Sequence, residues 1–282
     1  MAERLKGAEV AKRLNAETIA RVEALKEKGV IPTLAVLRVG AREDDLSYER
    51  GLLKRCAACG VEANVFAYPE DITQEAMLDE VKRVNEDTSI HGVLIFCPLP
   101  KSLDEKAIRK ALKPEKDVDG ITDGSLFGVF TGQKVGYPPC TPDACMEILK
   151  HYDVDLTGKR AVVVGRSLVV GRPVAMMLME KNATVTICHT KTKDVASICR
   201  EADVLIAAAG KARMIGAEHV SQGQIVLDVG IHAASEGGLC GDVDFDAVEP
   251  IVSQITPVPG GVGAVTTAVL VSHVVAAAEK AR

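Results

Sequence analysis

The sequence lacks a strong excess of charge of either sign. Lysine and arginine together number 34, and aspartate and glutamate 39, so the formal net charge is −5 at pH 7. The basic residues are scattered along the chain, whereas nucleic-acid-binding proteins usually gather them into a patch or stripe. We therefore expect no nucleic-acid partner.

The sequence also lacks an apolar segment of membrane-spanning length. The Ala- and Val-rich segment Val265 to Ala281 is interrupted by His273 and Glu279, and a spanning helix needs about 20 apolar residues. We expect a packed terminal helix there and no membrane partner. At the other end, Met1 to Lys28 carries charges of both signs, unlike an acid-poor targeting leader, and is predicted to be an amphipathic helix.

The cysteines do not form the pattern of a disulfide-bonded secreted protein. All eight are dispersed, several fall in predicted strands or helices, and no secretory leader precedes them, so we expect a reducing, cytoplasmic location. The segment Cys56-Ala57-Ala58-Cys59 has redox or zinc spacing, but it lies in a helical stretch and no second pair matches it. We therefore expect no metal site.

The length and composition predict two α/β domains. With 282 residues and 47% hydrophobic content, the chain can bury two moderate cores, and it shows no internal repeat. The first half predicts a β-α-β-α-β series. Its strands are expected at 33–39, 61–68 and 92–96, and its helices at 45–59 and 73–85.

A turn-rich passage at 113–142 follows this series, and we place a domain boundary near Pro139. Beyond it, buried apolar runs predict a doubly wound, Rossmann-type parallel sheet. Its strands are expected at 162–164, 184–188, 204–207 and 224–230.

The most informative motif begins at the first of these strands. The apolar run 162–164 enters a turn at Gly165 and then a helix that carries Pro173 near its start. A strand that turns through glycine into a helix N-terminus is a common phosphate-binding arrangement, and it predicts a nucleotide site. The spacing of Gly165 and Gly171 departs from G-x-G-x-x-G, so a strand-turn-helix without a ligand is the alternative.

The end of the second strand favours NADP over NAD. NAD-binding chains commonly place a carboxylate there for the ribose hydroxyl, but this segment reads Cys188-His189-Thr190-Lys191. Together with Arg166 it would suit a 2′-phosphate, because a guanidinium pairs with phosphate through two parallel hydrogen bonds. The alternative is that these are solvated loop charges.

Three polar clusters lie outside the nucleotide motif. Ser47-Tyr48 follows a polar loop, where a tyrosine can either stack on a planar ligand or be half-buried in the core. Lys116 to Gly120 holds two aspartates, which bind a ligand or form a solvated turn with a helix cap. Thr256 to Thr266 has two prolines and three glycines before a helix, which makes a stiff loop that is costly as a mere connection.

These clusters and the nucleotide motif together resemble one known family, the methylenetetrahydrofolate dehydrogenase/cyclohydrolases of one-carbon metabolism. The motifs occur in the family's order over nearly the whole chain. They are K-D-V-D-G at 116–120, P-C-T-P at 139–142, V-G-R-S-x-x-V-G-x-P at 164–173, D-V-G-I at 228–231 and P-V-P-G-G-V-G at 257–263.

The resemblance implies an enzyme that oxidises 5,10-methylenetetrahydrofolate with NADP and hydrolyses the methenyl product to 10-formyltetrahydrofolate. It implies a folate-binding catalytic domain at 1–139, with 266–282 packing back on it, and an NADP-binding Rossmann domain at 140–265. It also implies a homodimer.

The resemblance assigns roles residue by residue. Cofactor binding is expected at Gly165, Arg166, Ser167, Thr190 and Ile231. Tyr48 resembles the ring that stacks on the folate, and Asp119 resembles the carboxylate that grips the pterin, so both are expected to be catalytic. The loop is expected to close over the substrate through Pro257, Pro259, Gly260 and Gly261.

Two positions depart from the family pattern. Most members carry a lysine four residues after the tyrosine and a glutamine before the P-L-P motif, where this chain has Leu52 and Phe96. Lys54 would lie on another face of the helix, about 240° around from Tyr48. Hydride transfer needs no protein acid or base, whereas hydrolysis of the methenyl bridge does. We therefore hypothesise that cyclohydrolase activity is weak or absent, which would leave a monofunctional dehydrogenase.

Two further functions stay open from the residues alone. One is a dehydrogenase for a different small substrate, such as an amino or hydroxy acid, built on the same two-domain plan. The other is a non-catalytic regulator that binds folate and NADP, which Leu52 and Phe96 would explain.

Overall fold

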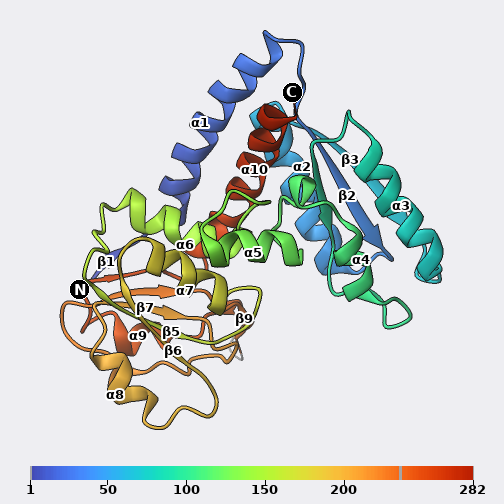
Figure 1. The fold of residues 1–282 in the computed structure, drawn as a ribbon. Coiled ribbons are helices and arrows are strands. Elements are labelled where there is room, and N and C mark those ends of the chain that lie inside the picture. The colour runs from blue at the N-terminus through green and yellow to red at the C-terminus, as the bar shows by residue number, and fades with distance from the viewer. Residues whose placement is uncertain (1, 235–236, 282) are drawn as a thin grey trace. The chain divides into compact units, whose positions relative to one another are not determined.

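The chain forms two α/β units, each built around its own parallel sheet. The structure, a computed structural model, describes residues 2–234 and 237–281 (Figure 1). One unit contains the residues up to Lys12 together with Thr141–Thr266, and the other contains Arg13–Cys140 and the residues from Thr267 onward. No described helix is both long enough and apolar enough to cross a membrane.

The first unit is a six-stranded sheet in the order β1-β11-β8-β7-β5-β6, with all of its pairings parallel. Helices lie on both faces of this sheet (Figure 1), as a doubly wound fold requires. Its strands are β1 (Glu3–Arg4), β5 (Arg160–Val164), β6 (Thr184–Cys188), β7 (Val204–Ala207), β8 (Ile225–Asp228) and β11 (Gln254–Ile255). Its helices are α6 (Cys140–His151), α7 (Gly171–Glu180), α8 (Val195–Arg200) and α9 (Phe245–Val248).

A short antiparallel hairpin, β9 (His232–Ala233) and β10 (Leu239–Cys240), follows β8. The strand order reverses between β5 and β7, since the chain runs from β5 to β6 on one side and then continues through β7 on the other. In such sheets, ligands bind at the carboxyl ends of the strands beside the reversal. The turn after β5 is therefore the expected ligand position in this unit.

The second unit is a three-stranded parallel sheet in the order β3-β2-β4. Every residue of the central strand is buried, which its unbroken apolar sequence explains. The strands are β2 (Thr33–Val39), β3 (Glu62–Tyr68) and β4 (Gly92–Ile95). The helices are α1 (Gly7–Lys26, from Arg13 onward), α2 (Glu43–Cys59), α3 (Gln74–Glu86), α4 (Glu105–Ala111), α5 (Asp123–Thr131) and α10 (Thr266–Lys280, from Thr267 onward).

The terminal helix α10 packs against α1, as the family resemblance implied. The Arg21 guanidinium donates two hydrogen bonds to Glu279, at 3.0 and 2.8 Å, and a third to the Ser272 hydroxyl at 3.1 Å.

Two predictions about local structure were wrong. The first residues are not part of one long helix, because Glu3–Arg4 forms strand β1 against β11, a partner that local periodicity cannot reveal. The passage 113–142 is not all turn, because it contains α5. The glycines inside α5 allow close packing: a Cβ on Gly124 would lie 2.4 Å from Pro114 Cγ, and one on Gly128 would lie 2.3 Å from the Val135 carbonyl oxygen.

A fully buried carboxylate, Asp117, holds the segment between β4 and α5. Its oxygens accept hydrogen bonds from the Ile121 N–H at 3.0 Å, the Thr122 N–H at 2.8 Å and the Ser125 hydroxyl at 2.6 Å. Buried donors that lose their acceptor each cost about 1–3 kcal/mol. Asp117 is therefore a structural residue of the K-D-V-D-G motif.

Replacing Asp117 with alanine should lower the free energy of unfolding by about 3 kcal/mol, because it leaves three buried donors unpaired. Urea denaturation measures this change. Asp71→Ala, at an exposed position, is the matched control and should stay within about 0.5 kcal/mol of the wild type. Equal stability of the two variants would contradict the structural role.

Candidate active site

The glycine turn after β5 lies at the strand-order reversal of the first unit. Gly165 has φ +130°, and a Cβ there would lie 2.0 Å from the Ala208 carbonyl oxygen. A Cβ on Gly171 would lie 2.2 Å from the Gly165 carbonyl oxygen. The unusual glycine spacing therefore has a steric cause: the start of α7 packs directly on the turn, and both positions need a residue without a side chain.

This turn leaves backbone donors available for an anion. Helix α7 begins at Gly171, and no side chain caps its N-terminus. Ser167 braces the turn, because its hydroxyl accepts a hydrogen bond from the Val170 N–H at 3.1 Å. Uncapped N–H groups at the start of a helix attract phosphate through their partial positive charge. The cradle fits a dinucleotide pyrophosphate.

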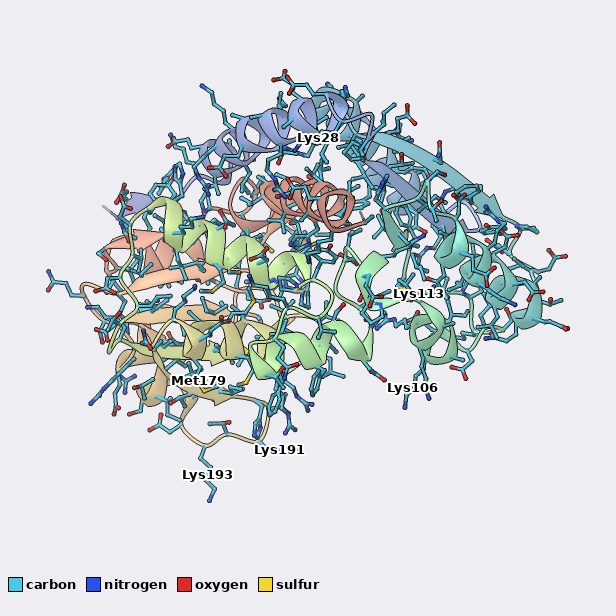
Figure 2. The ribbon with its side chains drawn as sticks, turned by 45° about the horizontal axis from the view of Figure 1, so that its top comes forward. Lys28, Lys106, Lys113, Met179, Lys191 and Lys193 are labelled. Carbon is cyan, nitrogen blue, oxygen red and sulfur yellow. The ribbon has the colours of Figure 1, made fainter. Side chains whose placement is uncertain are left out.

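The cationic and hydroxyl-bearing residues expected at a 2′-phosphate are exposed. Arg166, Thr190 and Lys191 all present their side chains to solvent. The loop after β6 is ordered by the Lys191 N–H, which donates to His189 Nδ1 at 3.1 Å. Figure 2 shows Lys191 and Lys193 extending from this loop, with Lys193 directed away from the ribbon.

Residues of D-V-G-I and of the proline–glycine loop line one cavity of about 310 Å³ in the first unit. Ile231 is 59% exposed there. A Cβ on Gly263 would lie 3.2 Å from Ile231 Cδ1, so the loop and Ile231 are in close reach. The structure thus brings together Ile231 with Pro257, Pro259, Gly260 and Gly261.

Two buried carboxylates brace this cavity, and sequence reasoning missed both. Asp228 accepts hydrogen bonds from the backbone N–H groups of Gly230, Asp242 and Val243 at 2.9–3.0 Å. Burial nevertheless raises the pKa of Asp228 to about 6. Asp242 in turn accepts from the Gly210 N–H at 2.9 Å and lies 2.7 Å from His232 Nε2. The signal available in the sequence was an aspartate at the end of an apolar strand.

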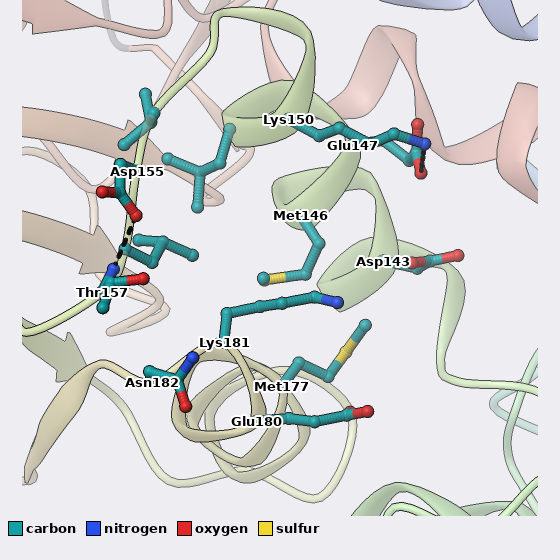
Figure 3. Close-up of a pocket in the computed structure, with 13 residues that line it drawn as sticks. Asp143, Met146, Glu147, Lys150, Asp155, Thr157, Met177, Glu180, Lys181 and Asn182 are labelled. Atoms are coloured by element: carbon teal, nitrogen blue, oxygen red, sulfur yellow. Dashed lines mark hydrogen bonds and ion pairs between the residues drawn. The ribbon is translucent and has the colours of Figure 1, made fainter.

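A larger cavity of about 720 Å³ lies elsewhere in the first unit, between α6 and the end of α7 (Figure 3). Its lining combines methionines with charges of both signs, including Glu147, Lys150, Glu180 and Lys181. None of the residues expected at the site from the sequence lines it. We do not assign the active site to this cavity.

In the second unit, Tyr48 on α2 is 41% exposed and meets the Phe96 ring edge-on, with centroids 5.7 Å apart. Leu52, one helical turn further, is fully buried, and Lys54 is exposed to solvent. The structure therefore places no lysine amine at the position that the family pattern fills. Partial burial, and then the Asp119 charge, raise the pKa of the Tyr48 hydroxyl, which stays protonated and able to donate.

Asp119 is electrostatically coupled to Tyr48 and is the second residue expected to be catalytic. Removal of its carboxyl group from water raises its pKa to about 6. A hydrogen bond from the Cys140 thiol acts in the opposite direction, and the nearby Asp117 charge raises the pKa further. The carboxylate is therefore the dominant form at neutral pH, and the protonated form becomes populated near pH 6.

The backbone beside Asp119 is held from two sides by residues that sequence reasoning did not assign. The Val118 carbonyl oxygen accepts from the Cys140 thiol at 3.3 Å and from His273 Nδ1 at 2.9 Å. Gly120 has φ +70°, and a Cβ there would lie 2.4 Å from Pro139 N. A histidine within the apolar α10 was the one signal in the sequence.

Near Asp119, an ion pair holds the chain that follows β4. The Arg109 Nη2 lies 2.6 Å from one Glu105 oxygen, and the other accepts a hydrogen bond from the Leu99 N–H at 2.8 Å. Arg109 also bonds Cys97, which burial gives a pKa of about 11, so this thiol is neutral at physiological pH. The wall beside Asp119 is thus uncharged at Cys97 and Phe96.

The two units together define a class of protein: a Rossmann-type nucleotide unit joined to an α/β unit that presents a partly desolvated carboxylate and an exposed aromatic ring. Residues 139–282 match the tetrahydrofolate dehydrogenase/cyclohydrolase NAD(P)-binding domain, and residues 5–119 match the catalytic domain of the same family. The chain belongs to the tetrahydrofolate dehydrogenase/cyclohydrolase family.

Individual relatives agree over the full length. Proteins named "Bifunctional protein FolD" from Carboxydothermus hydrogenoformans and Clostridioides difficile are 54% and 53% identical, covering 99% and 97% of this chain and 98% and 95% of theirs. The FolD crystal structure from Campylobacter jejuni superposes with a TM-score of 0.96 at 39% identity, covering 99% of each chain.

A Trypanosoma brucei methylenetetrahydrofolate dehydrogenase-cyclohydrolase, solved with NADP cofactor and an inhibitor, gives a TM-score of 0.92 at 36% identity and covers 99% of this chain and 98% of that one. The comparisons do not support the hypothesis that hydrolysis is lost, because the close curated relatives carry a bifunctional name.

Proposed function

We propose that this protein oxidises 5,10-methylenetetrahydrofolate with NADP and hydrolyses the methenyl product to 10-formyltetrahydrofolate. The observation that carries the proposal is the pairing of Asp119 with Tyr48 in one unit, in a chain whose other unit carries the glycine cradle at Gly165. On this proposal, the unit around β2 binds the folate and the unit around β5 binds NADP.

Asp119 would orient the pterin. The pterin ring presents an amino group and an adjacent N–H as two parallel donors, which match the two oxygens of a carboxylate. In a partly desolvated site such a pair fixes orientation, while the exposed Tyr48 ring offers a stacking surface. The Cys140 and His273 contacts to the Val118 carbonyl oxygen keep this carboxylate in place.

The dehydrogenase step then requires positioning and no protein acid or base. NADP, when bound, supplies the acceptor for the hydride that leaves the methylene carbon. The substrate nitrogen lone pair drives that departure, so the protein's task is to hold the donor carbon in line and to exclude water. Apolar neighbours of the site such as Phe96 and Ile231 suit that task.

The hydrolytic step would use the groups around Tyr48 in place of the usual lysine. The Tyr48 hydroxyl stays protonated and can orient the attacking water. The charges that reach this hydroxyl belong to Asp119 and Arg55. We propose that water activation depends on this set, because Leu52 is buried and carries no proton.

Arg166, in the glycine turn, is proposed to bind the 2′-phosphate of NADP. Loss of a charge-assisted bidentate contact costs about 1.5–3 kcal/mol, or roughly 10–100-fold in affinity. Arg166→Ala should therefore raise the KM for NADP by that factor and leave the KM for NAD within about twofold. Steady-state kinetics with each cofactor measures the difference, and an equal loss for both would remove the 2′-phosphate assignment.

The dehydrogenase should lose folate turnover in acid. Because only the ionised Asp119 accepts both pterin donors and its pKa is raised to about 6, kcat/KM for the folate should fall as pH drops below about 6. Removing the Cys140 hydrogen bond raises that pKa further, so Cys140→Ala should move the fall to higher pH. An unchanged profile in Cys140→Ala would assign the titration to another group.

Cyclohydrolase activity should be present. Purified protein mixed with methenyltetrahydrofolate should speed the decay of its absorbance well beyond the buffer blank, and Tyr48→Phe should slow that decay more than it slows the dehydrogenase. Decay at the blank rate, in a preparation active as a dehydrogenase, would overturn the hydrolytic half of the proposal.

We also propose that the protein is a homodimer, as the family resemblance implies. Sedimentation equilibrium tests this directly, and a monomer mass across micromolar concentrations would refute it.

A further inference from the structure

The first residues of the chain run beside the segment that leads into the proline–glycine loop. Strand β1 is the outermost strand of its sheet and pairs in parallel with β11, which ends two residues before Pro257. The Glu3 N–H donates to the Ser253 carbonyl at 2.8 Å, and the Leu5 N–H donates to the Ile255 carbonyl at 2.9 Å. Leu5 is fully buried, so the pairing is anchored in the core.

The pairing continues beyond the strands and reaches the loop itself. The Gly7 N–H donates to the Gly260 carbonyl oxygen at 2.9 Å. The Gly260 backbone has φ +105°, a conformation that favours glycine. The N-terminal segment therefore bonds the loop at its most unusual backbone position.

Gly7 also contacts the loop by shape. A Cβ at this position would lie 2.1 Å from the Gly261 carbonyl oxygen and 3.0 Å from Val265 Cγ2. Gly7 has no left-handed φ, so the need for glycine here is one of space and not of backbone conformation. The Gly261 carbonyl occupies the volume that any side chain at position 7 would fill.

Tyr152 holds the residue before Gly7 in place. Its hydroxyl accepts a hydrogen bond from the Lys6 N–H at 2.8 Å and donates one to the Lys6 carbonyl oxygen at 3.2 Å. One phenol thus satisfies both backbone groups of Lys6. The approach of Gly7 to the loop is set by this clamp on one side and by β11 on the other.

We infer that Gly7 is a positioning residue for the folate reaction and that Glu3–Gly7, clamped by Tyr152, sets the position of the loop Pro257–Gly263. The inference rests on the proposed function, in which this loop closes over the substrate. The loop lines the same cavity as Ile231, so a shift of the loop changes the wall against which the reactants are held. A misplacement of about 1 Å at such a wall can cost about 100-fold in rate.

Gly7→Ala is the direct test. The added methyl group must displace the Gly261 carbonyl, so kcat/KM for the folate should fall about 10–100-fold. The KM for NADP should stay within about twofold, because the Gly165 turn is untouched. Hydrogen–deuterium exchange followed by mass spectrometry should show faster exchange in a peptide covering 257–263, with little change in peptides from β5 or β7.

Two further variants separate positioning from folding. Gly51→Ala is the matched control, because Gly51 is exposed on α2 and a Cβ there meets no atom within 4 Å. It should leave both kinetics and exchange unchanged. Tyr152→Phe removes a single oxygen and should change the folate kinetics and the loop exchange in the same direction as Gly7→Ala, by a smaller factor. If Gly7→Ala does not fold, this variant decides.

The inference is overturned if Tyr152→Phe and a folded Gly7→Ala both retain wild-type folate kinetics and wild-type exchange in the loop. Failure of the proposed function is a separate outcome. In that case the wild type and Gly51→Ala would show no dehydrogenase activity, and the exchange data would still judge whether the N-terminal segment holds the loop.

Discussion

One carboxyl group, that of Asp119, must be partly removed from water and still remain charged at neutral pH. Desolvation raises its pKa to about 6, and the Cys140 hydrogen bond limits the rise. The compromise holds only if the backbone beneath the carboxylate is rigid, because a mobile chain would return the group to solvent. Rigidity comes from the buried Asp117 and from the two donors that meet at the Val118 carbonyl oxygen.

The same principle appears in the nucleotide unit with a different purpose. Asp228 is buried and pairs with three backbone N–H groups, so it organises the turn that presents Ile231. The glycine cradle at Gly165 and Gly171 supplies uncapped backbone donors. Each unit therefore uses a buried aspartate to fix a loop and leaves its ligand-facing groups exposed. Chemistry that depends on orientation more than on proton transfer suits this arrangement.

Buried parallel strands could be predicted from the sequence with their full bounds at 33–39, 184–188 and 204–207, because such strands are short apolar runs between turns. Tyr48, Asp119 and the loop at 257–263 could be found because motifs mark them. The contacts that hold them could not. His273 lies 155 residues from Val118 and Gly7 more than 250 from Gly260, and local pattern carries no information about such partners. Glycines that serve close packing, as in α5, were misread as turns.

The account depends most on Asp119 accepting the pterin's two donors while the dinucleotide lies on the Gly165 turn. A crystal structure with NADP and a non-reactive folate analogue tests this most directly. We expect both Asp119 oxygens within about 3 Å of the pterin amino and ring N–H groups, with the pyrophosphate at the start of α7. A pterin bound away from Asp119, or a dinucleotide bound away from that turn, would contradict the account.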